Sequence, residues 1–164
     1  MGDGNVESIN NVQFLKTDPK ARYQGYTFYF REGFCWNNVL NPRARLLKVK
    51  LKQASVNDVG SMSLMPILKF VSSKYIIALL NSNLIFDYYR EFVNCTVNVQ
   101  INDLRQIPII IPNNQMLNKI NELIDKAIAI KKSARQSDET DSFDKSIAYI
   151  ELEIDKIVEQ LYLI

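Results

Sequence analysis

The side chains with the clearest chemical potential are cations and amides in the first half of the chain. Arginine and lysine can donate hydrogen bonds to guanine, asparagine can pair with adenine, and further cations neutralise phosphates. These residue types, placed on expected turns and strand faces, predict contacts with duplex DNA. We expect Arg43 and Arg45 to read bases from a turn, and Lys48 and Lys50 to hold phosphates from a strand. The full candidate set is Lys20, Arg22, Arg31, Asn37, Asn38, Arg43, Arg45, Lys48 and Lys50.

Charge is unevenly distributed, although the formal net charge is only +2. Residues 1–74 carry eleven Lys/Arg against five Asp/Glu, whereas residues 75–164 carry nine against thirteen. Between Lys16 and Lys52 the count is nine basic to two acidic residues. Phosphate binding depends on such a local excess rather than on the overall charge. An ordinary solvated basic face is the alternative interpretation.

Several kinds of catalytic site are excluded by composition. There is no histidine, which removes Ser-His-Asp and Cys-His nucleophiles and histidine-ligated metals. Cys35 and Cys95 are too few for a metal cluster or disulfide framework, so we expect buried, reduced thiols. The five glycines are scattered and form no phosphate-binding loop. We therefore predict neither catalysis nor a metal or other cofactor.

Other side chains have two interpretations each. Trp36 and Tyr23 either press on sugars and thymine methyls or belong to the core. A single Arg105 is expected to pin its turn to a nearby carboxylate, and Lys131 and Lys132 to complement the dipole of a helix end. The carboxylates Glu151, Glu153 and Asp155 would suit a nuclease, but the helical pattern around them favours a solvated flank.

Alternating residues predict the strands that would carry these groups. Two strands are expected between Tyr23 and Trp36, with Glu32-Gly33 as a turn or bulge. From Arg45 to Leu51, Leu47, Val49 and Leu51 should face the core, opposite Lys48, Lys50 and Lys52. Pro66 limits the apolar stretch from Ser63 to Phe70 to an edge strand or a break. Further strands are expected from Cys95 to Ile101 and through Ile111, with Pro108 at an edge. Asn37-Asn38, Asn41-Pro42 and Asn57-Asp58 with Gly60 predict turns.

Helical periodicity dominates the second half. A helix capped by Ser72 or Ser73 should bury Tyr75, Ile76, Leu79 and Leu80, and a second, from about Asn83 to Phe92, should bury Leu84, Ile85, Tyr88, Tyr89 and Phe92. A single turn is expected at Asn102 to Arg105. A long helix from Asn114 to Lys132 carries a stripe of Met116, Ile120, Leu123, Ala127 and Ile130, and Ser133 to Ser142 reads as a polar loop. The last helix repeats apolar residues in steps of three and four, which predicts an antiparallel hairpin with an interaction seam of Ile147, Ile150, Ile154, Ile157, Leu161 and Ile164.

Three runs together resemble a known family: Ala78 to Ser82 (ALLNS), Thr96 to Gln100 (TVNVQ) and Asp103 to Pro108 (DLRQIP). They are similar to the closing part of target recognition domains in restriction-modification enzymes, of the TaqI-like C-terminal specificity type or the type I specificity subunits. Upstream, Ala21 to Tyr23, Phe30 to Trp36 and Asp58 to Ser61 resemble the same domains less distinctively. The resemblance implies a module that reads DNA while another domain carries out methylation. The methyltransferase tetrad Asn-Pro-Pro-aromatic is missing, since Asn41-Pro42 continues into Arg43-Ala44.

The expected architecture is α+β. We predict a twisted, mostly antiparallel sheet or partial barrel with short packed helices, followed by an antiparallel two-helix, coiled-coil-like arm. Residues 1–11 would be a disordered or vector-derived terminus, residues 12–112 the recognition domain and residues 113–164 the arm. At 164 residues with 47% apolar content, no membrane-length apolar run and no signal peptide, the chain is expected to be cytoplasmic.

The predicted function is sequence-specific recognition of double-stranded DNA. The arm would dock to a methyltransferase or endonuclease catalytic domain, or form a homodimer, and the chain would be a fragment of a larger enzyme or a free-standing specificity protein. Two rival functions remain open: a protein-interaction scaffold acting through the arm, and a carboxylate-dependent nuclease. Salt-dependent DNA binding would separate the first rival from recognition, and magnesium-dependent cleavage would reveal the second.

Overall fold

A computed structural model describes residues 28–56, 60–68, 70–134 and 140–163. It contains a three-stranded antiparallel sheet in the order β2-β1-β3, with β1 (Gly33–Asn37) between β2 (Lys50–Lys52) and β3 (Ser61–Leu64). The helices α2 (Ser73–Leu80), α3 (Asn83–Tyr88) and α4 (Ile101–Leu104) follow, and a π-helical turn, η2 (Tyr89–Val93), extends α3. Two long helices, α5 (Asn114–Ala134) and α6 (Thr140–Tyr162), complete the α+β fold. None of the described helices is long and apolar enough to cross a membrane.

The central strand β1 is buried along most of its length. Phe34, Cys35 and Trp36 are 5%, 6% and 1% exposed, and the Trp36 indole N–H donates to the Val99 carbonyl at 3.0 Å. Trp36 is therefore a core residue with a satisfied polar group. At Gly33 an added Cβ would lie 2.4 Å from the Leu64 carbonyl oxygen, so β3 can approach β1 only because this residue has no side chain.

The predicted strands around β1 need two corrections. Residues 28–31 form a turn, closed by an Arg31 N–H to Phe28 carbonyl bond of 3.3 Å with Phe30 at φ 58°, so the alternation expected there is wrong. The strand predicted over Arg45 to Leu51 is reduced to Lys50–Lys52, because Lys48 adopts φ 55°. The first part of this expected strand pair, from Tyr23 to Thr27, lies outside the described residues. The edge strand that was one interpretation of the Ser63 to Phe70 stretch is β3, which ends at Leu64, before Pro66.

The Cys95 to Ile101 strand is also a wrong prediction. Among the described residues, this stretch forms only an isolated bridge, between Asn98 and Val39, and Cys95 is exposed. Side chains make the local bonds instead: Asn94 Oδ1 accepts the Thr96 N–H at 2.8 Å, and Asn94 Nδ2 donates to the Asn98 carbonyl at 2.9 Å. Such side-chain bonds compete with a strand ladder. Among the described residues, the strand expected through Ile111 likewise forms no ladder.

The helices agree better with the sequence patterns. Ser72 caps α2 by accepting the Tyr75 N–H at 3.0 Å, as predicted. In the second helix, Ile85 and Tyr89 are buried as expected, but Phe92 is 72% exposed. The π-helical turn η2 explains the difference, because one extra residue per turn rotates the following side chains off the helical stripe. Phe86, which the prediction omitted, is also buried, in the same core as Ile85 and Tyr89.

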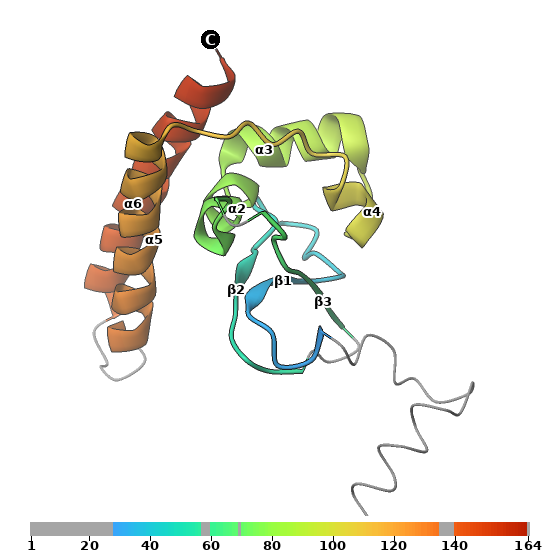
Figure 1. Cartoon of the computed structure of the whole chain (residues 1–164), viewed down its shortest axis with the longest axis horizontal. Coiled ribbons are helices and arrows are strands. Elements are labelled where there is room, and N and C mark those ends of the chain that lie inside the picture. The colour runs from blue at the N-terminus through green and yellow to red at the C-terminus, as the bar shows by residue number, and fades with distance from the viewer. Residues whose placement is uncertain (1–27, 57–59, 69, 135–139, 164) are drawn as a thin grey trace, which may run out of the picture.

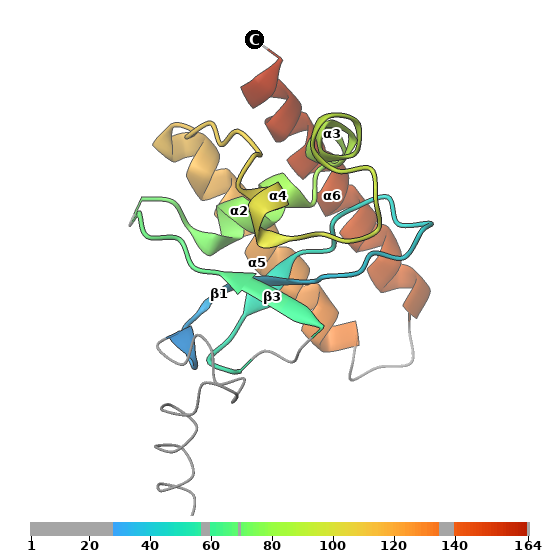
Figure 2. The ribbon, with the colours of Figure 1, turned by 90° about the vertical axis from the view of Figure 1, so that its right-hand side faces the viewer.

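The two long helices form the predicted antiparallel hairpin, but they are not a protruding arm. Figures 1 and 2 show α5 and α6 side by side, with α5 next to α2. Ile150, Ile154, Ile157 and Leu161 of the predicted seam are 5–7% exposed and belong to the same core cluster as Trp36, while Ile147 is half-buried. Ile164 lies outside the described residues. The seam is thus covered by the chain itself, and the assignment of these side chains to a partner interface is corrected.

Candidate nucleic-acid interface

The loop that follows β1 presents Arg43 and Arg45 to solvent. Asn41 builds the turn beneath them: its Oδ1 accepts the Arg43 N–H at 2.9 Å, and its carbonyl accepts the Ala44 N–H at 2.8 Å. The predicted Asn-Pro turn is therefore present. Before the turn, the Leu40 N–H donates to the Val97 carbonyl at 2.8 Å, which ties the loop to the chain after η2. The two arginines are exposed on a turn that is fixed at its base.

A third arginine joins them from a distant part of the sequence. A shallow hollow, called here the arginine hollow, has Arg43, Arg45 and Arg90 on its wall. The Arg90 guanidinium is oriented by a 2.6 Å bond from Nη1 to the Thr96 carbonyl. The remaining lining residues are Leu40, Asn41, Pro42, Ala44, Phe86 and Val97, with no carboxylate among them. Three guanidinium groups around an apolar floor suit an anionic or acceptor-rich ligand, such as a phosphate or the edge of guanine.

A second cationic hollow lies between β2 and the end of α5. This lysine hollow is lined by Lys50 of β2 and by Lys131 and Lys132 of α5, together with Cys35, Leu51, Lys52, Gln53, Ala54, Ser55, Val56, Ser61 and Ile128. The lining contains no carboxylate, and Glu151 lines the neighbouring cavity that shares Lys50 and Lys131. The two α5 lysines were expected only to complement the helix dipole. Their proximity to Lys50 could not be predicted from a helical pattern, because the contact depends on how α5 packs beside the sheet.

An amide side chain positions the strand that carries Lys50. Asn81, the C-cap of α2, accepts the Val49 N–H at 2.8 Å with Oδ1 and donates to the Val49 carbonyl at 2.7 Å with Nδ2. The amide thus makes the pair of bonds that a neighbouring strand would make. This explains why residues before Lys50 need no strand partner. Asn81 belongs to the ALLNS run, whose resemblance to target recognition domains gave no indication of this contact.

Lys52 departs from the predicted cationic face. Its side chain is buried, and the ammonium donates to the carbonyls of Arg31 at 2.8 Å, Ser55 at 2.6 Å and Gln53 at 3.3 Å. Because the chain turns sharply after β2, these three carbonyls surround Nζ and use all three of its protons. Lys52 therefore ties the turn at 53–55 to the segment before β1. Leu51, predicted to be buried, is 36% exposed.

The remaining candidates are dispersed. The Arg31 guanidinium lies 5.3 Å from the centre of the Phe28 ring, a cation–π contact, and Asn37 is exposed at the end of β1. Asn38 is half-buried, with its backbone bonded to Gly60 and Val99, and Lys48 is exposed. Lys20, Arg22 and Tyr23 lie outside the described residues. Among the described residues Arg105 has no carboxylate partner of the kind expected, and its Nη1 donates to Asn102 Oδ1 at 3.2 Å.

Two of the three carboxylates considered for a nuclease, Asp155 and Glu153, have structural contacts. Asp155 accepts the Asn83 N–H at 2.9 Å and its Nδ2 at 2.6 Å, which caps α3 from α6. Glu153 pairs with Lys156 at 2.9 Å, and this contact holds the pKa of Glu153 below its ordinary value. Burial raises the pKa of the Cys35 thiol, which disfavours the nucleophilic thiolate. Within the described part of the chain, no group of three or more His, Cys, Asp and Glu side chains could hold a metal ion.

No protein-family model matches this chain, and no curated protein matches it either.

Proposed function

We propose that this chain is a sequence-specific recognition module for double-stranded DNA that serves a restriction-modification enzyme or DNA methyltransferase and carries no catalytic centre of its own. The observation that supports the proposal best is the arginine hollow. It brings Arg90 to the turn that carries Arg43 and Arg45, and no carboxylate neutralises the three charges from the hollow's own lining.

The roles of the two hollows follow from their side chains. Arginines on a fixed turn can form paired hydrogen bonds to guanine O6 and N7, so the arginine hollow is the base-reading surface. Lysines are mobile point charges, so the lysine hollow contributes phosphate attraction without sequence preference. The family resemblance of the ALLNS, TVNVQ and DLRQIP runs points in the same direction, and it implies that methylation or cleavage belongs to a partner domain.

The test is binding of the chain to a labelled duplex over a range of salt concentrations. Engagement of several phosphates predicts that log K falls steeply and linearly with log salt, by about 0.9 per phosphate neutralised. Selection from a randomised duplex pool then measures sequence preference. A folded chain that binds no duplex at low salt would rule out the recognition role, and magnesium-dependent cleavage by the chain would favour the nuclease alternative.

A further inference from the structure

One short loop connects the two parts of the arginine hollow. It comprises residues 94–100, between η2 and α4, and is called here the bracing loop. Its Thr96 carbonyl accepts a hydrogen bond from Arg90 at 2.6 Å, and the next carbonyl, that of Val97, accepts the Leu40 N–H at 2.8 Å. Figure 2 shows the chain descending from α3 to α4 beside the loop that follows β1. Two adjacent peptide groups thus set where Arg90 lies relative to the turn that carries the other two arginines.

The side chain of Asn94 holds the bracing loop. Its Oδ1 accepts the Thr96 N–H at 2.8 Å. Its Nδ2 donates to the Asn98 carbonyl at 2.9 Å and to Asp103 Oδ2 at 2.8 Å. All of these bonds are of ordinary length for an amide. Asn94 therefore fixes the residue whose carbonyl orients the Arg90 guanidinium.

Asn94 is itself fixed from two sides. Its backbone N–H donates to the Tyr89 carbonyl at 2.8 Å, which closes the π-helical turn η2, and Tyr89 is fully buried. Asp103 of α4 accepts the Asn94 amide and also the Gln100 N–H, each at 2.8 Å. A carboxylate is a stronger acceptor than a neutral carbonyl. The loop is therefore attached to the core at its start and to α4 at its end.

The Arg90 guanidinium keeps one recognition edge. Its bond to Thr96 uses Nη1, and across the described residues Arg90 makes no other hydrogen bond. The edge formed by Nε and Nη2 therefore retains its donors, and such an edge can pair with guanine O6 and N7. A guanidinium that is already held by one nitrogen loses less side-chain freedom when it binds.

We propose that Asn94 is a positioning residue for base recognition: held by Asp103, it fixes the Arg90 guanidinium in register with the turn that carries the other two arginines. This role rests on the proposed function and deepens it by naming what sets the spacing of the three guanidinium groups. Asn94 is not part of the lining of the arginine hollow. It acts on DNA only through the Thr96 carbonyl and Arg90.

Selection of the whole chain on a randomised duplex pool, followed by affinity measurements on the selected sites, tests this role. Arg90→Ala and Asn94→Ala should each lower discrimination at one and the same base position by about tenfold, with preferences at the other positions unchanged. Because Asn94 acts through Arg90, the double variant should lose no more discrimination than Arg90→Ala alone. Asn94→Ser, a smaller change that keeps an acceptor oxygen but removes both amide donors, should cause a smaller loss at that same position.

Asn113→Ala is the matched control. Asn113 Oδ1 likewise accepts a backbone N–H, from Met116 at 2.9 Å, and it lies outside the arginine hollow. This variant should leave every sequence preference unchanged, and thermal unfolding establishes that all variants remain folded. A loss in Asn94→Ala that spreads over all base positions, or that adds to the loss in Arg90→Ala, would overturn the positioning role.

A measurement without DNA separates this role from the proposed function. NMR relaxation of the Arg90 Nε–H group in the free chain reports how ordered the guanidinium is on the fast timescale. The order should be high in the wild type and in Asn113→Ala, and it should drop in Asn94→Ala. Unchanged order in Asn94→Ala would overturn the positioning role even in a chain that binds duplex. An ordered Arg90 in a wild type that binds no duplex at low salt would instead refute the proposed function, and the reading role of Arg90 with it.

Discussion

The helical layer and the loops around the sheet are held in place by different kinds of interaction. In α2, α5 and α6, most apolar positions of the periodic pattern are buried in one continuous core or packed against it. Around the sheet, strands are three to five residues long, and side chains such as Asn41, Asn81 and Lys52 satisfy much of the loop backbone. The helical layer therefore supplies stability, whereas the loops are fixed by specific polar contacts and display cations to solvent.

The largest expected effect on stability comes from a substitution in the core of the helical layer. Ile154→Asp places a charge at a position that is 6% exposed and packed within the core. An unpaired buried charge together with reduced apolar burial should lower the free energy of unfolding by about 3–5 kcal/mol. Leu152→Asp, two residues away and 52% exposed, should change it by less than about 0.5 kcal/mol. Urea denaturation measures both, and equal effects would mean that α6 is not packed as described.

Alkaline pH should weaken the junction between α3 and the chain after it. Burial, and secondarily the nearby Asp103 carboxylate, raise the pKa of Tyr89 from 10.0 to about 12. Because the folded-state pKa is the higher one, this contribution to stability is fully present below pH 10 and is lost as pH rises toward 12. Two pKa units correspond to about 2–3 kcal/mol.

The free energy of unfolding, measured by denaturant titration between pH 9 and 12, checks this expectation. Tyr89→Phe should remove part of the decline with pH, although the substitution also removes a hydroxyl. Tyr149→Phe, at a 63% exposed position on α6, is the control that should keep the wild-type slope. A Tyr89→Phe profile that parallels the wild type over this range would argue against an ionisation-linked loss at Tyr89.

The arginine hollow should govern which sequences are bound. Replacing Arg43, Arg45 or Arg90 with lysine keeps the charge but removes the planar guanidinium fork. For each arginine that reads a base, discrimination against the wrong base should fall by about 1–3 kcal/mol, while binding to random duplexes changes little. Selection from a randomised pool by each variant measures this. Unchanged sequence preferences in all three variants would place the reading surface elsewhere.

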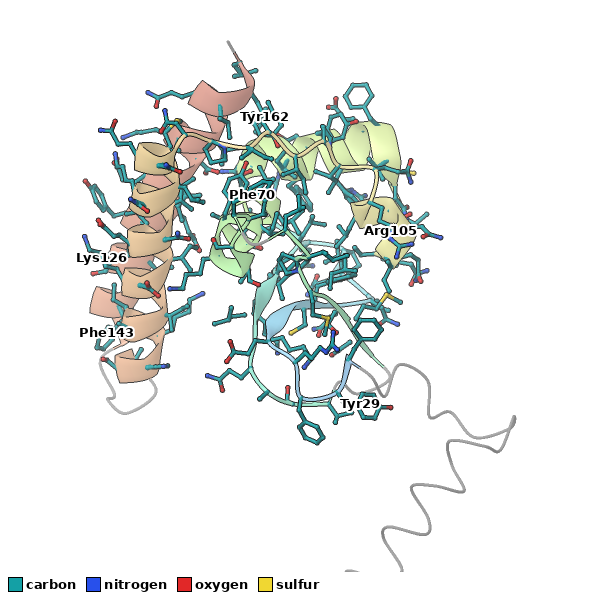
Figure 3. The ribbon with its side chains drawn as sticks, viewed as in Figure 1. Tyr29, Phe70, Arg105, Lys126, Phe143 and Tyr162 are labelled. Atoms are coloured by element: carbon teal, nitrogen blue, oxygen red, sulfur yellow. The ribbon has the colours of Figure 1, made fainter. Side chains whose placement is uncertain are left out.

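The lysine hollow should have the smallest and least selective effect. Lys50→Ala, Lys131→Ala and Lys132→Ala should each weaken binding to all duplexes alike, and the salt slope should fall by about 0.9 for each phosphate that is no longer neutralised. Lys126→Ala is a matched control, because Figure 3 labels this exposed lysine on the side of α5 away from the sheet. A control variant that weakens binding as much as the other three would show that only overall charge matters.

Some features followed from sequence alone because they depend on neighbours along the chain. Ser72 at a helix start, the apolar stripe of α5 and the repeat of α6 predicted these helices well, since propensity, capping and period agree locally. The Asn41 turn was predictable for the same reason. The sequence pattern did not decide whether Trp36 is a core residue or a DNA contact, and the structure places it in the core.

Tertiary structure decided what depends on distant partners. Strand alternation failed at Lys48 and at Cys95 to Ile101 because side-chain amides and hydroxyls took the backbone bonds that a ladder would have used. Arg90 reaches the turn of Arg43, and Lys131 reaches Lys50, only through the packing of helices beside the sheet. The sequence by itself determined which residues repeat with a helical period and which carry charge. Whether the α6 seam faces a partner or the chain's own core depends on packing. In the structure the seam residues share one core cluster with α2 and α5.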